Sequence, residues 1–492
     1  MAWYGLFFMG KIDLTTIDLG RHIQNGQMII DGQFDVLDTN FYSYTEPDFF
    51  FVNHHWAGGV IFYFIWKVFG FTGLSILYLL LSLIVFYLFF KIAQKEAGFK
   101  LSLLLSVILI PLMAARTEIR PEGFSYLFIA LFFWILWSWR RGKLDSRWLF
   151  ILIPLELLWV NVHIYFIFGI ALIGLFWVDK IIKDKRFDKK ISLILGLTGL
   201  ISLINPFGYK GLLYPFNIFK EYGYQIVENK SVWFLENWGF NNPDLRLFEI
   251  CLGLLILSFI ILLIRNRKRF SFIYTTLAIV WGFLGFMAIR NFTMFGFFAL
   301  LIIGYNLRWS RLRLKKISLF LIIFLSLIIL LISFSVYKNK LPLNEYVFGF
   351  GLMENNNRSV EFFNELNLQG PIFNNYDLGA YLIFYLFPEH RVFTDNRPEA
   401  YSISHFQDIY IPVQQDNLAW QNLDKVYNFN TIYFSHRDYT PWGQNFLIER
   451  VKDDDWVVIY FDLFNIIFIK NNQSNQEIIK KYQIPKSVFG IK

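Results

Sequence analysis

Ile317–Phe334 reads ISLFLIIFLSLIILLISF, an apolar run of 18 residues with no charged side chain. A run of about 18 apolar residues or more is long enough to cross the hydrocarbon core of a bilayer as a helix. Similar runs recur from residue 72 onward, and only 17% of the chain is charged, against roughly 25% in ordinary soluble domains. The sequence therefore predicts a polytopic α-helical membrane protein.

The apolar runs predict about 10–11 membrane-spanning helices. They lie at 72–90, 101–115, 123–139, 148–161, 165–179, 191–204, 247–264, 271–289, 292–307 and 317–336. The first ten residues, MAWYGLFFMG, are too short to span, so we expect a truncated first span or a partial anchor, and we favour truncation. Residues 56–69 are expected to form a helix at the membrane surface. Residues 1–340 are thus the expected transmembrane domain, with a first outer loop at 11–55.

Basic residues mark one side of the membrane. Five loops are strongly basic and alternate with near-neutral or acidic loops; they carry Lys91, Lys95 and Lys100, then Arg140, Arg141, Lys143 and Arg147, then Lys180, Lys183, Lys185, Arg186, Lys189 and Lys190, then Arg265, Arg267, Lys268 and Arg269, then Arg308, Arg311, Arg313, Lys315 and Lys316. Because basic loops face the cytoplasm, the other loops face outward. All seven histidines fall on that outer side: His22, His54, His55, His163, His390, His405 and His436. We therefore expect any chemistry to be extracytoplasmic.

The composition changes after the last expected span, and residues 341–492 predict a soluble extracytoplasmic α/β domain. Helices are expected at 360–366 and 378–386, and strands at 371–374, 391–394, 431–435, 456–460 and 465–470. Asp395, Arg397 and Glu399 follow one expected strand, where α/β domains often place ligand loops. The alternative is a structural Asp–Arg pair that ties the strand to its loop.

The first outer loop is the polar exception in an apolar chain. From Asp18 to Trp56 it reads DLGRHIQNGQMIIDGQFDVLDTNFYSYTEPDFFFVNHHW. Asp18 is a candidate general base toward an acceptor hydroxyl, or a helix N-cap. Arg21 is a candidate phosphate ligand, with His22 beside it, and the alternative is a charge pair within the loop.

His54 and His55 are adjacent, and adjacent side chains on a helix or strand face different ways. They are therefore a weak metal signal; we expect one to line a cavity and the other to pack or cap the surface helix. The single cysteine, Cys251, lies in an expected span and excludes a disulfide framework or a cysteine metal site. We predict no metal site, although a divalent cation is compatible with the sequence.

Three further segments place polar groups beside apolar runs. Arg116, Glu118, Arg120 and Glu122 share one short outer loop, where a helical turn would display them on two faces; they predict a phosphate clamp or an interfacial salt-bridge cluster. The turn WVNVH contains Asn161 and His163 and predicts either a cavity lining or an interhelical hydrogen bond. Arg290 predicts either a contact with a lipid diphosphate or a side chain that extends to the membrane surface.

In this order, the segments resemble bacterial membrane glycosyltransferases of the GT-C superfamily, the class that includes dolichyl-phosphate-mannose-type and aminoarabinose-type transferases. The matching features are DLGRHIQNG at 18–26, NHHW at 53–56, RPEG at 120–123, WVNVH at 159–163, NPFGY at 205–209 and the C-terminal domain. The resemblance implies a GT-C-like fold in the inner membrane, a polyprenyl-phosphate-linked sugar donor, an extracytoplasmic acceptor, inversion at the anomeric carbon, and Asp18 as the base. A paired acid found in some relatives is absent at Asp18–Leu19.

Two other classes of function stay open on the sequence. A transporter of lipid-linked glycans is expected to have ionisable or broken-helix positions near mid-membrane and a doubled architecture, but only Glu156 is central and no half is repeated. A non-catalytic scaffold or assembly protein would use the soluble domain to bind partners. The net charge of +8 does not indicate nucleic acid, because the excess lies in short loops between apolar runs.

Overall fold

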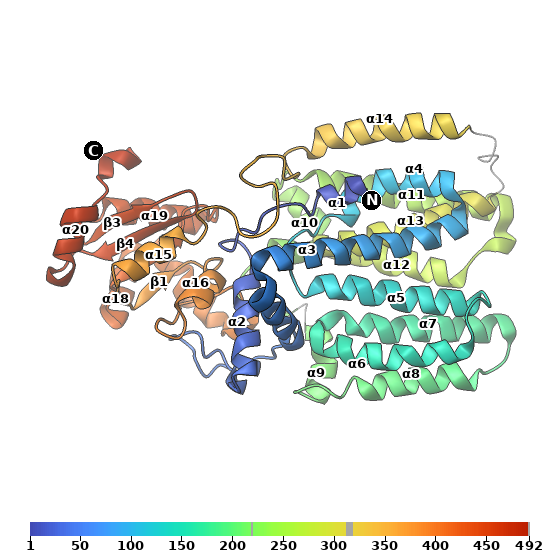
Figure 1. The fold of residues 1–492 in the computed structure, drawn as a ribbon, viewed down its shortest axis with the longest axis horizontal. Coiled ribbons are helices and arrows are strands. Elements are labelled where there is room, and N and C mark those ends of the chain that lie inside the picture. The colour runs from blue at the N-terminus through green and yellow to red at the C-terminus, as the bar shows by residue number, and fades with distance from the viewer. Residues whose placement is uncertain (218–219, 311–317, 491–492) are drawn as a thin grey trace. The chain divides into compact units, whose positions relative to one another are not determined.

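The computed structural model describes residues 1–217, 220–310 and 318–490 (Figure 1). The chain forms two compact units. Unit 1 comprises Met1–Lys11, Ser75–Pro215 and Ile226–Phe350, and unit 2 comprises Ile12–Leu74, Phe216–Gln225 and Gly351–Lys492. The first outer loop therefore folds with the C-terminal residues, whereas the sequence pattern places it in the expected domain 1–340.

Unit 1 is a helical bundle. Its helices are α1 (Ala2–Leu6), the later part of α3 (Trp56–Ala97), α4 (Phe99–Met113), α5 (Glu122–Arg140), α6 (Leu152–Val162), α7 (Ile167–Asp184), α8 (Lys189–Ile201), α9 (Tyr209–Leu213), α10 (Val232–Asn237), α11 (Pro243–Asn266), α12 (Phe272–Met287), α13 (Phe292–Trp309) and α14 (Leu319–Tyr337).

Six helices in the described part of the chain are long and apolar enough to cross a membrane. They are Trp56–Ala97, Glu122–Arg140, Ile164–Asp184, Pro243–Arg269, Ile289–Trp309 and Leu319–Tyr337. The expected 10–11 spans also require the shorter helices α4, α6, α8 and α12. Even α12, with 16 residues, is only about 24 Å long at 1.5 Å per residue, less than the ~30 Å hydrocarbon core. By length and composition, the six long helices indicate a membrane-embedded protein, and the total number of spans depends on whether the shorter helices also cross.

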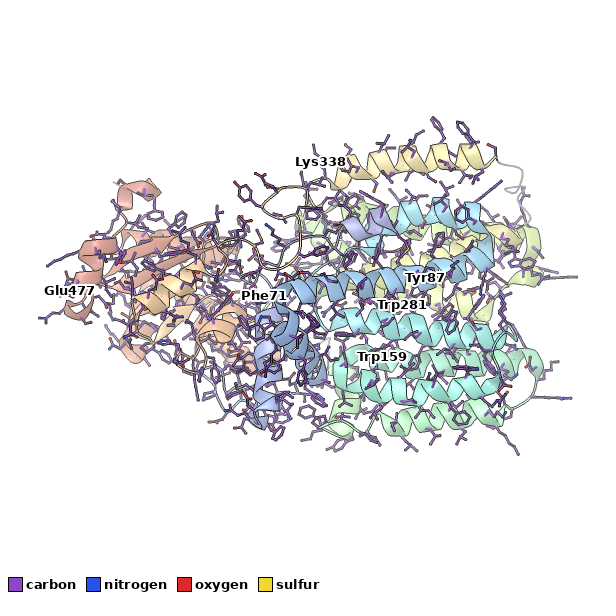
Figure 2. All side chains as sticks on the ribbon, in the orientation of Figure 1. Phe71, Tyr87, Trp159, Trp281, Lys338 and Glu477 are labelled. Carbon is purple, nitrogen blue, oxygen red and sulfur yellow. The ribbon has the colours of Figure 1, made fainter. Side chains whose placement is uncertain are left out.

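Helix α13 is the centre of unit 1. All residues from Phe292 to Asn306 are buried, and α4, α11 and α12 pack around them. Aromatic rings fill the interior, as Trp281 stacks on Phe298 with centroids 5.6 Å apart. Figure 2 shows side chains occupying the space between the helices, with Trp159 and Trp281 among the buried ones. A helix that is apolar and buried all round is typical of a bundle core.

Helix α3 is two helices joined at Gly70. Gly70 has φ 63° and ψ −164°, a conformation that glycine adopts without steric cost. The break separates residues 56–69 from the long apolar segment that follows, which is where the sequence placed the boundary between a surface helix and a span.

Unit 2 is built on a four-stranded sheet. The strands are β1 (Ile372–Asn374), β2 (Thr431–Ser435), β3 (Trp456–Phe461) and β4 (Asn465–Lys470), in the order β1-β2-β4-β3. β1 and β2 are parallel, and the other pairs are antiparallel. Its helices are α2 (Leu19–Ile30), the first part of α3, α15 (Arg358–Glu365), α16 (Gly379–Leu386), α17 (Pro412–Gln415), α18 (Asn417–Tyr427), α19 (Pro441–Lys452) and α20 (Gln476–Tyr482).

The core of unit 2 is aromatic. Phe373 packs against Trp420 and Phe446, with ring centroids 4.9 and 5.2 Å away. The inserted segment 216–225 joins this core, because Tyr224 stacks on Tyr376 at 4.0 Å. Large buried rings contribute more apolar area than any other side chains, so they explain how three separate segments of the chain form one unit.

The prediction of a strand at 391–394 is wrong. Those residues make only an isolated bridge from Val392 to Ser43. The first outer loop supplies that partner, and it also forms an ion pair from Asp13 to Arg437 at 2.6 Å. A strand needs a neighbouring strand with which it can form a series of backbone hydrogen bonds. The neighbour here is a loop segment, so the run does not become a strand of the sheet.

Two glycine contacts hold α2 in place. A Cβ on Gly26 would lie 2.2 Å from the carbonyl oxygen of Gly59 in α3, and a Cβ on Gly20 would lie 3.0 Å from the carbonyl oxygen of Ala380 in α16. Contacts this close require that the two backbones meet without a side chain between them. They set α2 against the start of α3 and against α16.

Gly26→Ala is expected to destabilise unit 2 by about 1–3 kcal/mol, the usual cost of overpacking. The added methyl must push α2 away from Gly59. The matched control is Gly253→Ala in α11, where an added Cβ meets nothing within 4 Å. Thermal unfolding of the full-length protein measures both, and equal midpoints for the two variants would contradict the close crossing.

Candidate functional site

The candidate base Asp18 belongs to a polar group in unit 2. Asp18 is the N-cap residue of α2, and its side chain is 18% exposed. Its Oδ2 lies 3.5 Å from Nη2 of Arg21 and 3.5 Å from Nε2 of His22. Nε of Arg21 donates to Oδ1 of Asn396 at 3.4 Å. We call Asp18, Arg21, His22, His54, His55 and Asn396 the Asp18 group.

The three histidines of this group are in contact. The rings of His22 and His55 meet edge to face at 5.4 Å, and those of His54 and His55 are 3.8 Å apart. His54 and His55 lie in the turn before α3, so the rule for adjacent side chains on a helix or strand does not apply to them. Five residues that the sequence singled out from positions 18–22 and 54–55 therefore lie in one group.

The Asp395–Arg397 pair borders the Asp18 group. Oδ1 and Oδ2 of Asp395 accept from Nε and Nη2 of Arg397 at 2.7 and 2.6 Å, and Tyr401 donates to Oδ2 at 3.0 Å. Burial alone would raise the pKa of Asp395, but the guanidinium charges of Arg397 and Arg21 hold it below its usual value. Arg397 is 1% exposed, so the pair is the structural alternative that the sequence left open.

Unit 1 contains a second charged set. Nη1 of Arg116 contacts Glu228 at 2.5 Å, its Nη2 contacts Glu122 at 3.2 Å, and Arg120 contacts Glu118 at 2.6 Å and Glu228 at 3.3 Å. We call Arg116, Glu118, Arg120, Glu122, Glu228 and Arg290 the Arg116 cluster. Residues 114–121 form a loop and not a helical turn, so the predicted display on two helix faces is wrong.

Glu228 links the arginines of this cluster. Burial raises its pKa, but Arg116, Arg120 and Arg290 outweigh that effect and hold the pKa well below its usual value. Three arginines meet three glutamates, so the cluster carries no net charge. A phosphate could bind there only by displacing a glutamate, and the salt-bridge interpretation fits the geometry of the cluster better than a preformed phosphate clamp.

The lowered pKa of Glu228 predicts acid sensitivity. The unfolded chain takes up this proton near pH 4.5 and the folded chain only at lower pH, so the stabilisation is complete above pH 4.5 and is lost as the pH falls below it. Glu228→Gln should lower the stability of unit 1 at pH 7 by about 1–3 kcal/mol and flatten its loss below pH 4.5. Thermal unfolding between pH 3 and pH 7 measures this, with the exposed Glu221→Gln as control. An equally steep loss of stability below pH 4.5 in both variants would contradict this role of Glu228.

The remaining predicted site residues are held by hydrogen bonds in unit 1 or by the Arg116 cluster. Asn161 donates to the carbonyl oxygen of Leu157 in its own helix at 2.8 Å and to that of Ile204, just after α8, at 3.0 Å. His163 is buried, and its Nδ1 is 2.9 Å from Oγ of Ser125. Nη1 of Arg290 donates to Asn229 at 2.9 Å, and its Nη2 lies 4.0 Å from Glu122. The interhelical bond is thus the interpretation that fits His163, because Ser125 lies in α5. Asn161 bonds instead to its own helix and to the turn after α8.

Three residues that contact the candidate sites were not predicted from the sequence. Asn396 lies between Asp395 and Arg397 in the sequence, but its amide carries no charge that would have singled it out. Glu228 is one of several acids in the loop 205–246, and nothing in its spacing distinguishes it from Glu221 or Glu236. Tyr126, which donates to Oε1 of Glu122 at 2.6 Å, lies in an apolar run. Position in the tertiary fold identifies these three residues, and the local pattern does not.

Among residues 1–217, 220–310 and 318–490, no three His, Cys, Asp or Glu side chains gather as a metal site. A comparison of the sequence with protein-family models finds no match, and a comparison with curated proteins finds none. The functional conclusion therefore depends on the residues themselves.

Proposed function

We propose that the protein is a membrane glycosyltransferase of the GT-C type. It would move a sugar from a polyprenyl-phosphate donor to an extracytoplasmic acceptor, with inversion at the anomeric carbon, in the inner membrane of a bacterium. Asp18 would be the general base. The observation that carries the proposal is the Asp18 group, in which an accessible carboxylate, an arginine and three histidines meet although they come from separate parts of unit 2.

The proposed step needs three elements of chemistry. The carboxylate of Asp18 takes the proton of the acceptor hydroxyl as that oxygen attacks the anomeric carbon. The bond from that carbon to the phosphate oxygen breaks, and its electron pair leaves with the polyprenyl phosphate. Arg21, a fork of fixed donors suited to phosphate oxygens, would stabilise the charge that develops on the leaving group.

The six apolar helices support the membrane setting of this proposal. A lipid-linked donor is itself a membrane component, so its enzyme is expected in the bilayer. The Asp18 group is the stronger candidate for the phosphate, because the Arg116 cluster is neutral and closed by Glu228. The Arg116 cluster is retained as a second phosphate candidate that would require movement of Glu228.

The test uses the full-length protein in liposomes that contain polyprenyl-phosphate sugars and an envelope fraction as acceptor. Transfer predicts that labelled sugar leaves the lipid and that free polyprenyl phosphate appears. A transporter would move the intact lipid across the bilayer, and a scaffold would leave it unchanged. An intact donor after incubation with every sugar tried would overturn the proposal.

A further inference from the structure

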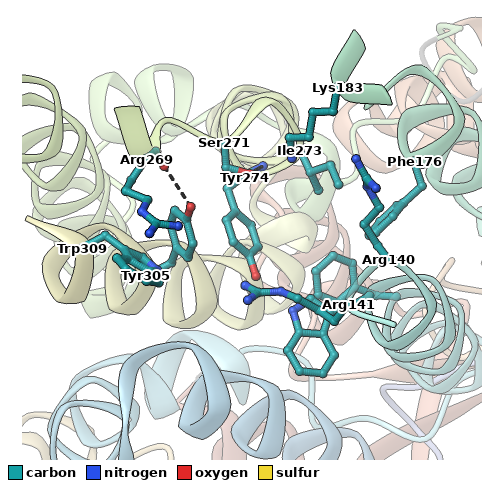
Figure 3. A pocket seen from close by; sticks show the side chains of 12 residues that line it. Arg140, Arg141, Phe176, Lys183, Arg269, Ser271, Ile273, Tyr274, Tyr305 and Trp309 are labelled. Atoms are coloured by element: carbon teal, nitrogen blue, oxygen red, sulfur yellow. Dashed lines mark hydrogen bonds between the residues drawn. The ribbon is translucent and has the colours of Figure 1, made fainter. Parts of the chain in front are cut away.

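A basic pocket lies within unit 1, and none of its lining residues belongs to the Arg116 cluster. Its volume is about 240 Å³, and it is lined by α5, α7, α12, α13 and the residues at their ends. Figure 3 shows four cationic side chains around it, Arg140, Arg141, Lys183 and Arg269. These residues belong to three of the five basic loops of the sequence, so the pocket lies at the basic ends of the helices.

The charges of the pocket do not cancel. Arg140 and Lys183 share Asp179, with contacts of 2.9 and 2.8 Å, and Arg141 pairs with Glu96. These contacts place two carboxylates against three cations. Asp184 also contacts Arg140, at 3.3 Å, but Arg269 adds a fourth cation at the rim of the pocket.

Arg269 is the cation that the described residues leave without an acid. Its guanidinium stacks on the ring of Trp309 at 4.0 Å, and no carboxylate among residues 1–217, 220–310 and 318–490 forms an ion pair with it. Tyr305 donates to the backbone oxygen of Arg269 at 2.8 Å and fixes its position. The stacking leaves the five N–H donors of the guanidinium directed around its edge.

Trp309 supplies a second observation. Its indole Nε1 is buried and has no hydrogen-bond partner in the described part of the chain. A buried N–H without an acceptor is unfavourable, and such a group normally finds a partner. An anion beside Arg269 would supply that acceptor.

We propose that this pocket binds the phosphate of an anionic phospholipid head group. Basic pockets between the ends of transmembrane helices suit such head groups, and Trp and Tyr favour the membrane interface. A volume of about 240 Å³ lies below the roughly 300–1,000 Å³ of drug-sized ligand sites, so it fits a head group better than a nucleotide. Three of the helices that line it, α5, α7 and α13, are long and apolar enough to cross a membrane, so lipid would lie beside the pocket.

The test measures lipid binding by full-length protein in detergent, with native mass spectrometry and thermal shift as readouts. Phosphatidylglycerol, phosphatidylcholine and inorganic phosphate are titrated in separate arms. We expect phosphatidylglycerol to bind tightest, and Arg269→Gln to weaken it about fivefold. Trp309→Phe keeps an aromatic ring under Arg269 but removes the indole N–H donor, so a smaller loss is expected.

Arg267→Gln is the matched control, because Arg267 lies two residues away in the same short helix, Arg267–Arg269, and does not line the pocket. If inorganic phosphate also binds and Arg269→Gln weakens that binding, the pocket is supported as a phosphate site and its ligand is assigned to free phosphate. Equal losses in Arg267→Gln and Arg269→Gln, or equal binding of phosphatidylglycerol and phosphatidylcholine, would overturn the proposal.

Discussion

Asp395→Asn is expected to destabilise unit 2 by about 3–5 kcal/mol, the usual cost of removing one partner from a buried ion pair. Asp395 accepts two hydrogen bonds from the Arg397 side chain and one from Tyr401. Both members of the pair are fully buried or nearly so, so the variant leaves a guanidinium charge without its counter-ion in a medium of low polarity. Thermal or denaturant unfolding of the full-length protein, followed by limited proteolysis of unit 2, measures the loss.

The matched control is Asp454→Asn. Asp454 also forms an ion pair, with Lys486 at 2.7 Å, but its side chain is 98% exposed. Exposed pairs contribute little, because water already solvates both charges. If Asp395→Asn unfolds at the same temperature or denaturant concentration as wild type, Arg397 must find another acceptor. That result would contradict a structural role for the pair.

The effect should extend to the Asp18 group. Asn396 lies between the two members of this pair in the sequence and accepts from Arg21. Gly379 packs against the same loop, since a Cβ there would lie 2.4 Å from Cα of Asp395. The buried pair therefore sets the position of a residue that contacts the candidate site, and its loss is expected to disturb that site as well as the fold.

The sequence predicted elements that local pattern alone determines. The strand at 431–435 and the hairpin strands at 456–460 and 465–470 match β2, β3 and β4 within one residue. Alternation and β-branched content are properties of the segment itself. The break at Gly70 was located for a similar reason, because an apolar aromatic helix and a longer apolar run meet there.

The sequence could not predict features that depend on distant partners. Residues 391–394 have the composition of a strand, but their neighbour is Ser43 in the first outer loop. Assignment of that loop to unit 2 likewise depends on contacts such as Asp13 with Arg437. Such contacts join positions hundreds of residues apart, and no local periodicity encodes them.

The candidate site shows the same limit. Asp18, Arg21, His22, His54 and His55 stood out because charge is rare in an apolar chain, and they lie in one group. Asn396 completes the group from the other end of the chain and carries no charge. For the Arg116 cluster, the sequence identified the arginines but not Glu228, the acid that binds two of them.

Asp18→Asn is expected to lower the rate of sugar transfer by about 10²–10⁴-fold, the usual contribution of a general base. Asparagine has nearly the same shape as aspartate but cannot take a proton from the acceptor hydroxyl. Arg21 remains in place, so binding of the donor should change little and the loss should fall on kcat. Kinetics at varied donor concentration, with donor binding measured separately, separate the two effects.

Asp31→Asn is the matched control, because Asp31 is the exposed C-cap residue at the other end of α2. It removes the same charge from the same helix without touching the Asp18 group. Transfer by Asp31→Asn should stay within about twofold of wild type, as expected for a surface substitution.

The most direct measurement is the release of free polyprenyl phosphate from a polyprenyl-phosphate sugar by wild type, Asp18→Asn and Asp31→Asn, reconstituted at equal density in liposomes. If Asp18 is the base, wild type and Asp31→Asn release polyprenyl phosphate, whereas Asp18→Asn releases almost none although it unfolds at the same temperature as wild type. Equal release by all three proteins would contradict the assignment of Asp18 as the base.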